Sequence, residues 1–313
     1  MFKFLINVLP ILGLVIGNET PIIGILSQPD YDYGYDTVIA ASYVKYLESA
    51  GARVLPIWIN QTVDYYERVV QYTNGVLFPG GSANFTLPGG YGETARTLYK
   101  LAKEANDKNE HYPIWGTCLG FEVLPYAQTG TDAVVTCSVP HGSFTLDFKG
   151  DYRNSRLYSP LPLELLDVLT GENVTYNSHH FCLTESGLAR RGIASDWHVL
   201  STNTDAAGLK FISSMEHREY PFYGTQFHPE KNNFEFKPDE GFAHSLRSVL
   251  VSQYFADFFV SEARKNDHRF PDRSLESRSL IYNYCPKFTG KENDYYYQVY
   301  GFEREDYARN NLL

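Results

Sequence analysis

Short apolar runs alternate with amphipathic segments from residue 22 to about residue 120, and this alternation constrains the fold more than any other feature. Each apolar run has the length of a strand buried on both faces, and each amphipathic segment has the spacing of a surface helix. The expected strands are 22–26, 53–57, 75–78 and 113–115, and the expected helices are 38–50, 63–72, 93–107 and one beginning near 118. Short connections between them predict an α/β fold with an open, mainly parallel sheet and helices on both faces.

The pattern changes after about residue 131. Short β-type runs at 133–136, 144–146, 198–201 and 208–213 predict antiparallel strands and loops added to the same sheet, and a further strand is expected over 222–227. Helical spacing near 242–265 predicts a long helix that closes the core. Beyond 267 the chain is polar and rich in Tyr, and we interpret it as a surface wrap with a partly loose end. The expected organisation is one domain over 18–290 and a C-terminal tail over 291–313.

The first 17 residues have the pattern of a secretory signal peptide. Lys3 precedes a mostly apolar run from Phe4 to Gly17, which is too short to span a membrane. An uncleaved anchor or a buried strand is the alternative. Four N-x-[ST] sequons fit a lumenal chain, because glycans are attached only there. The acceptors are Asn18, Asn60, Asn84 and Asn173. We therefore expect a secretory-pathway protein of the lysosome, the vacuole or the extracellular medium, with no membrane contact after signal cleavage.

Charge and cysteine content restrict the partners and the covalent framework. Lys and Arg number 27 against 37 Asp and Glu, which gives a formal net charge of −10. Without a dense cluster of cations, nucleic acid is an unsuitable partner, because binding requires neutralisation of phosphates. Four cysteines are too few for a disulfide scaffold. If Cys118 is a free thiol, the other three allow at most one disulfide, and the sequence leaves its pairing open.

A cysteine stands between glycines where an expected strand turns into a helix, in the run 116–120. Small flanking residues permit the strained backbone of a nucleophile elbow, which presents the side chain of Cys118 above the sheet. The helix N-terminus should lower the thiol pKa, and the backbone N–H of Leu119 would point where an oxyanion forms. A buried structural cysteine in a tight turn is the alternative.

A matching acid–base pair follows the expected strand 222–227. His228 would emerge at the same sheet edge as Cys118, and Glu230 lies two positions later, across Pro229. An orienting carboxylate sets the tautomer of the imidazole and stabilises its cation, as a Cys/His/acid set requires. The Gly pair after strand 75–78 exposes backbone N–H groups, and Gly81 is the expected second oxyanion donor. Each motif alone also fits an ordinary loop.

Two adjacent histidines, His179 and His180, could ligate a metal ion, but the sequence does not supply the rest of a metal-binding motif. No H-E-x-x-H or paired C-x-x-C motif is present to complete a ligand set, so we expect no metal. A substrate contact by His179 and a histidine whose hydrogen bonds are satisfied within a loop both remain open.

These motifs together resemble the class I glutamine amidotransferase-like superfamily, and within it the γ-glutamyl hydrolases of peptidase family C26. The segments that carry the resemblance are 21–29, 75–81, 113–122, 211–216, 220–231 and 258–266. Amidotransferases usually have Gln after the elbow, whereas here Phe121 is followed by Glu122, as in the hydrolases. The tail after about 290 and Ala206, where Gly is common, depart from the family pattern.

The resemblance implies a flavodoxin-like fold and a cysteine hydrolase that needs no cofactor. By position it implies Cys118 as nucleophile, His228 as general acid and base, Glu230 as its orienting partner and His179 as a substrate contact. The implied reaction is cleavage of γ-glutamyl amide bonds in folate poly-γ-glutamates through a Cys thioester, by a homodimer. Two other functions stay open: a glutaminase subunit that feeds a synthetase, and an inactive secreted relative that only binds γ-glutamyl ligands.

Overall fold

A computed structural model describes residues 17–237, 240–291 and 295–309. The expected signal peptide, residues 1–17, lies outside the described residues except for Gly17. Within the described ranges, no helix combines the length and the apolar character needed to cross a membrane.

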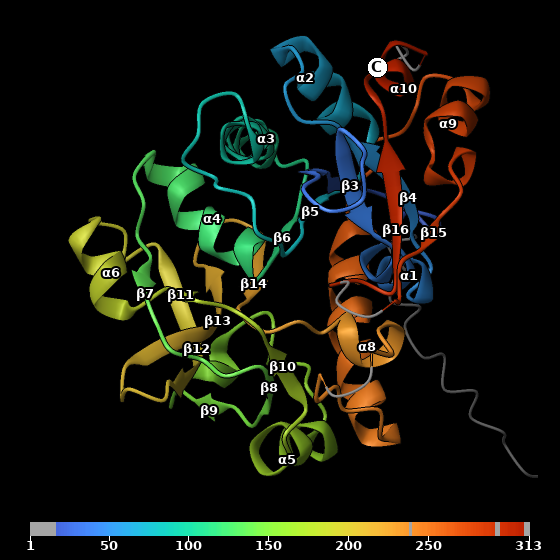
Figure 1. Ribbon diagram of the computed structural model, residues 1–313. Helices are drawn as coiled ribbons and strands as arrows, with labels where there is room; N and C mark the ends of the chain where they lie inside the picture. Colours follow the sequence, from blue (N-terminus) through green and yellow to red (C-terminus); the bar gives the residue numbers. More distant parts are fainter. Residues whose placement is uncertain (1–16, 238–239, 292–294, 310–313) are drawn as a thin grey trace, which may run out of the picture.

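The central element is an eight-stranded mixed sheet (Figure 1). In spatial order its strands are β4 (Arg53–Ile57), β1 (Ile22–Leu26), β5 (Val76–Phe78), β6 (Ile114–Thr117), β14 (Phe222–Thr225), β13 (Lys210–His217), β12 (Trp197–Thr204) and β9 (Asp147–Phe148). The first five strands run parallel, and the last three are added antiparallel to their neighbours. The predicted α/β class, with a mainly parallel sheet and added antiparallel strands, is confirmed.

Helices cover both faces of this sheet because side chains alternate along each strand (Figure 1). In β1, Ile22 and Leu26 join one core cluster, and Ile23 and Ile25 join the other. The first cluster includes residues of α2 (Val63–Tyr72), α3 (Tyr91–Asp107) and α4 (Leu119–Thr129). The second includes residues of α1 (Ala41–Ser49), α5 (Leu163–Gly171) and α8 (Leu246–Ala263). Strands buried on both faces are what the continuous apolar runs predict.

Three small antiparallel sheets and several short helices complete the described chain. Two of the sheets have two strands each: β10 (Thr175–Asn177) pairs with β8 (Gly142–Phe144), and β11 (Phe181–Cys182) with β7 (Val135–Thr136). The third has four strands in the spatial order β15 (Lys287–Phe288), β16 (Gln298–Phe302), β3 (Thr37–Ala40) and β2 (Gln28–Pro29). The remaining helices are α6 (Glu185–Arg190), α7 (Lys231–Phe234), α9 (Arg273–Ser279), α10 (Arg304–Arg309) and 3₁₀ turns at Tyr152–Asn154 and Ile281–Asn283.

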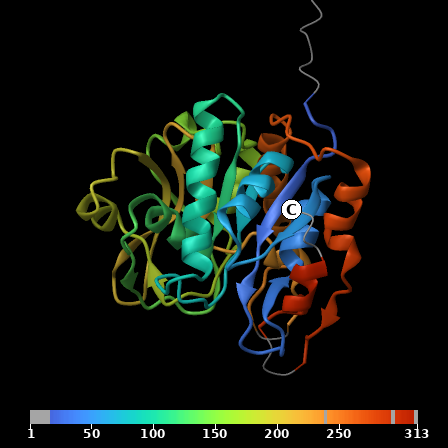
Figure 2. The same cartoon turned by 90° about the horizontal axis from the view of Figure 1, so that it is seen from above.

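The C-terminal segment differs from the expected surface wrap. Strand β16 pairs antiparallel with β3, and Val299 and Phe302 are fully buried. Figure 2 shows this orange-to-red segment alongside the blue N-terminal half. The difference has a local cause: the first residues of the predicted helix 38–50 form β3 instead, and that strand needs partners for its backbone groups. The boundary predicted at residue 290 stays a prediction.

Candidate active site

Cys118 occupies a strained turn between β6 and α4. Its φ of 51° and ψ of −109° are unusual for a residue with a side chain, and its N–H donates to the carbonyl of Thr225 at 2.9 Å. The glycines on either side permit close packing of the turn. A Cβ at Gly120 would stand 1.9 Å from the carbonyl oxygen of Phe78, and one at Gly116 would stand 2.5 Å from that of Gly120. The turn has the geometry expected of a nucleophile elbow.

His228 is positioned just beyond β14 by its backbone and by its side chain. Its N–H donates to the carbonyl of Tyr176 at 2.8 Å, and its Nδ1 lies 2.7 Å from Oε1 of Glu230. Both side chains are buried. Because an ionised carboxylate only accepts hydrogen bonds, Nδ1 carries the proton in this pair, and Nε2 keeps a lone pair that can accept one.

The glycine turn after β5 brings the nucleophile and the base together. A Cβ at Gly80 would stand 2.7 Å from Cε1 of His228 and 3.0 Å from Cβ of Cys118, so both side chains lie close to this glycine. The Gly80 N–H donates to the hydroxyl of Tyr43 at 2.7 Å, and the same hydroxyl lies 3.3 Å from Nδ1 of His228. Tyr43 thus ties the glycine turn to the base, a role that the sequence analysis missed.

The two expected oxyanion donors, Gly81 and Leu119, both line the cavity that Cys118 and His228 share. A Cβ at Gly81 would stand 1.9 Å from Oε1 of Gln28, whose Nε2 donates to the carbonyls of Pro79 and Gly80 at 3.1 and 2.8 Å. Gln28 therefore fixes the conformation of the turn. The backbone N–H of Leu119 acts on the Cys118 sulfur and lowers the thiol pKa, although other effects outweigh it.

One cavity of about 530 Å³ contains every expected chemical group except Glu230. Its lining includes Gly81, Cys118, Leu119, His179 and His228. Four further polar or aromatic residues line the cavity, and the sequence analysis assigned none of them a role there: Gln28, Glu122, Lys231 and Tyr296. A molecule in this space would contact both Cys118 and His228.

The expectation of a lowered thiol pKa is wrong for this structure. Burial raises the pKa of Cys118 well above its ordinary value, and the carboxyls of Glu122 and Glu230 raise it further. The N–H of Leu119 and the ammonium of Lys231 act in the opposite direction but do not prevail. The helix N-terminus is present as predicted, but burial destabilises the thiolate more than the helix dipole stabilises it.

Burial lowers the pKa of His228, although the charge and the hydrogen bond of Glu230 raise it in part. A neutral thiol therefore faces a neutral imidazole.

Burial also raises the pKa of Glu122 to about 8, and Nε2 of Gln226 donates to its Oε1 at 2.9 Å. This second carboxyl is protonated at neutral pH, which keeps negative charge away from the thiol.

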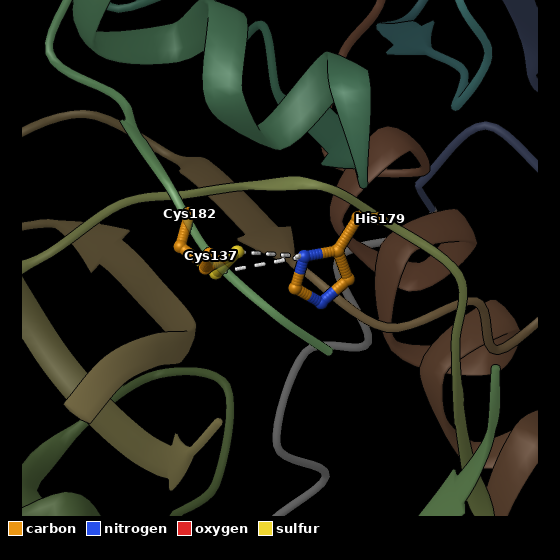
Figure 3. A group of neighbouring side chains, drawn as sticks. All are labelled: Cys137, His179 and Cys182. Carbon is orange, nitrogen blue, oxygen red and sulfur yellow. Dashed lines mark hydrogen bonds between the residues drawn. A yellow bond between two sulfur atoms is a disulfide. The ribbon is translucent and has the colours of Figure 1, made fainter. Parts of the chain in front are cut away.

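His179 lies in the cavity wall against a disulfide between Cys137 and Cys182 (Figure 3). Its Nδ1 lies 2.9 Å from the carbonyl of Phe181, and its Nε2 lies 3.1 Å from Oδ1 of Asn177. Burial lowers its pKa to about 4. Both nitrogens thus have partners in the protein, and a substrate contact stays a prediction.

The same three residues form the group that could hold a metal ion within the described ranges. Their candidate ligand atoms lie within 4.8 Å of one another (Figure 3). A metal binds thiolate, and here the two sulfurs are bonded to each other, so the oxidised group does not fit a metal site. The disulfide also agrees with the limit of one; the free cysteines are Cys118, buried, and Cys285, exposed.

The four sequons differ in their surroundings. Asn60, Asn84 and Asn173 are exposed, and Asn84 lies at the cavity. Asn18 is half-buried, and its amide nitrogen donates to Oδ1 of Asn74 at 3.1 Å. Attachment of a glycan at Asn18 would compete with this bond.

Comparison with known proteins places the chain in a family. A family model described as Peptidase C26 matches residues 21–230. A γ-glutamyl hydrolase of Mus musculus is 41% identical over 92% of this chain and 91% of its own length. That of Homo sapiens is 40% identical over 91% and 90%, and γ-glutamyl hydrolase B of Dictyostelium discoideum is 35% identical over 96% and 88%. Among solved structures, a glutamine amidotransferase from Thermotoga maritima is 10% identical with a TM-score of 0.43, covering 79% of this chain and 99% of its own. The family model and the relatives show that the chain belongs to the peptidase C26 family.

Proposed function

We propose that this chain is a cysteine hydrolase that cleaves the γ-glutamyl amide bonds of folate poly-γ-glutamates. The observation that carries the proposal is that Cys118 and His228 both lie against Gly80 and line one cavity, while Glu230 bonds to the imidazole of His228. The relatives that match nearly the whole chain are named γ-glutamyl hydrolases, which supports this substrate class.

Acylation begins from the neutral pair. Nε2 of His228 takes the thiol proton as the sulfur of Cys118 attacks the γ-carbonyl carbon and forms the C–S bond. The electron pair of the carbonyl moves to oxygen, where the N–H groups of Gly81 and Leu119 would hold the oxyanion. Collapse of this intermediate breaks the C–N bond, and His228 gives its proton to the leaving amine. Glu230 stabilises the transient imidazolium.

Deacylation uses the same groups with water as the nucleophile. His228 takes a proton from water, which attacks the thioester carbonyl, and the oxyanion returns to the same N–H groups. Breaking the C–S bond releases the shortened acid, and the sulfur regains its proton from His228. After the two steps Cys118 and His228 are back in their starting protonation states. The net reaction consumes one amide bond and one water molecule and yields one acid and one amine.

The setting of the reaction is part of the same proposal. The four sequons and the expected signal peptide support a protein of the secretory pathway, in lysosome or vacuole or outside the cell. The family resemblance supports a homodimer.

Product analysis on a ladder of pteroyl-poly-γ-glutamates tests the function. We expect shortened pteroyl-glutamates together with released glutamate or γ-glutamyl peptides, and no ammonia released from free glutamine. Glutamine hydrolysis without cleavage of the ladder would instead favour the glutaminase alternative, and tight binding of the ladder without any product would favour the inactive binding protein.

A further inference from the structure

The carbonyl oxygen of Gly80 accepts two side-chain hydrogen bonds that the mechanism above does not use. Nε2 of Gln28 donates to it at 2.8 Å, and the hydroxyl of Tyr296 donates to it at 3.3 Å. Gln28 is buried in β2, and Tyr296 lies in the segment that leads into β16. Because β2 and β16 both pair with β3, two distant parts of the chain meet at this one carbonyl. Burial raises the pKa of Tyr296, so its hydroxyl keeps the proton that it donates.

The backbone groups that precede this carbonyl in the turn also have partners. The carbonyl of Pro79 accepts from Nε2 of Gln28 at 3.1 Å and from the hydroxyl of Tyr91 at 2.8 Å. The N–H of Gly80 has its acceptor as well. In contrast, the N–H of Gly81 donates to no acceptor among the described residues, and Gly81 is exposed at the cavity. The turn therefore leaves this donor free for a group that enters the cavity.

The held carbonyl and the free N–H belong to the same peptide group. The peptide is trans, so the carbonyl oxygen of Gly80 and the amide hydrogen of Gly81 point in opposite directions. The two donors that hold the oxygen on the protein side therefore turn the hydrogen toward the cavity. They also polarise the amide, which makes its N–H a stronger donor. Two consecutive glycines would otherwise leave this peptide free to rotate, because neither has a side chain that restricts the backbone.

We propose that Gln28 and Tyr296 are positioning residues of the oxyanion hole. By holding the carbonyl of Gly80, they direct the N–H of Gly81 to the place where the oxyanion forms. The inference rests on the proposed function and adds two residues that act through the backbone. The glycine pair permits close approach of the substrate, and the two donors supply the rigidity that the pair lacks. The C-terminal segment, through the hydroxyl of Tyr296, thus takes part in turnover.

Steady-state kinetics on a pteroyl-γ-diglutamate test the assignment in the intact protein. Gln28→Met keeps the side-chain length and removes the donor, and we expect kcat to fall about 100-fold while KM changes little, because the oxyanion exists only beyond the ground state. Tyr296→Phe removes the longer bond and should lower kcat about fivefold. Gln61→Met is the matched control and should keep kcat, since Nε2 of Gln61 donates to the carbonyl of Ile59 at 3.0 Å, outside the cavity lining.

Alkylation of Cys118 separates a positioning role from a merely structural one. The sulfur displaces iodide from iodoacetamide: a C–S bond forms, the C–I bond breaks, the thiol proton passes to His228, and no oxyanion arises. We therefore expect Gln28→Met to be alkylated at the rate of the unmodified protein. Mass spectrometry of the peptide that contains Cys118 measures this rate, because the exposed thiol of Cys285 reacts as well.

The outcomes separate this proposal from the one on which it rests. Failure of the unmodified protein to cleave the diglutamate would overturn the proposed function, and the positioning role with it. Cleavage with an unchanged kcat in Gln28→Met would overturn only the positioning role. Equal slowing of turnover and alkylation would do the same, because Gln28 would then act through Cys118 or His228. If Gln28→Met does not fold, Tyr296→Phe takes its place: a lower kcat with unchanged alkylation supports the role, and an unchanged kcat contradicts it.

Discussion

The imidazole of His228 and the carboxylate of Glu230 share a buried hydrogen bond of 2.7 Å, although only one residue separates them in the sequence. The bond fixes the proton on Nδ1 and presents Nε2 as the base. Glu230 therefore sets the tautomer of the imidazole that we propose as the base.

Replacing the carboxylate should reverse the tautomer. In Glu230→Gln, the new amide can donate to Nδ1, which moves the imidazole proton to Nε2 and removes the base. We expect kcat on a pteroyl-diglutamate to fall about 1,000-fold while KM changes little. Steady-state kinetics measure this, with thermal unfolding as the control for folding. An unchanged kcat would show that Glu230 does not orient the base.

Tyr43 and Tyr46 provide a matched pair on α1. The hydroxyl of Tyr43 bonds to the Gly80 N–H, whereas the buried hydroxyl of Tyr46 has no partner among the described residues. Tyr43→Phe leaves a buried N–H unsatisfied and should lower the free energy of unfolding by about 2 kcal/mol. Tyr46→Phe should not destabilise the protein. Urea unfolding of both variants checks this, and equal losses would contradict the assigned bond.

Glu122 should make stability depend on pH. The unfolded chain loses this proton near its ordinary pKa of 4.5, whereas the folded protein holds it to about pH 8. The free energy of unfolding therefore loses the contribution of Glu122 as pH rises from 4.5 to 8. Glu122→Gln, which cannot ionise, should gain stability over the unmodified protein between pH 5 and pH 8. Urea unfolding at several pH values tests this, and a constant difference would rule out the raised pKa.

The Cys137–Cys182 disulfide joins residues 45 positions apart and closes the loop that contains β8, β9, β10 and α5. Replacing both cysteines by Ala frees this loop in the unfolded chain and should lower the free energy of unfolding by about 3 to 4 kcal/mol. Cys285→Ala, at the exposed free thiol, is the control and should change it little. Chemical denaturation compares the two. A double variant as stable as the control would show that the disulfide adds nothing.

Local sequence signals predicted the elements whose geometry is local. Glycines on both sides of Cys118 indicate a tight elbow, and the spacing of His228 and Glu230 allows a bond across one proline. Tyr43 could not be found in this way, because its helical spacing is the same as that of any core residue. Nor could Tyr296, because it reaches the site through the pairing of β16 with β3, which the sequence pattern does not reveal.

For a related reason, the sequence could not predict whether the pKa of the Cys118 thiol is raised or lowered. The helix N-terminus behind Cys118 and the nearby Glu122 are visible in the sequence, but the burial that raises the thiol pKa most and the approach of Glu230 depend on the tertiary structure. The net charge of −10 likewise conceals the one buried ammonium, Lys231, that lines the cavity among the described residues.

The central claim is that the sulfur of Cys118 becomes acylated by the substrate. Acid quenching during turnover of a pteroyl-poly-γ-glutamate, followed by digestion and mass spectrometry, measures this directly. We expect the peptide that contains Cys118 to carry the pteroyl-glutamyl group as a hydroxylamine-sensitive thioester, and Cys118→Ala to be folded, unlabelled and inactive. Turnover by Cys118→Ala at the rate of the unmodified protein would contradict the account.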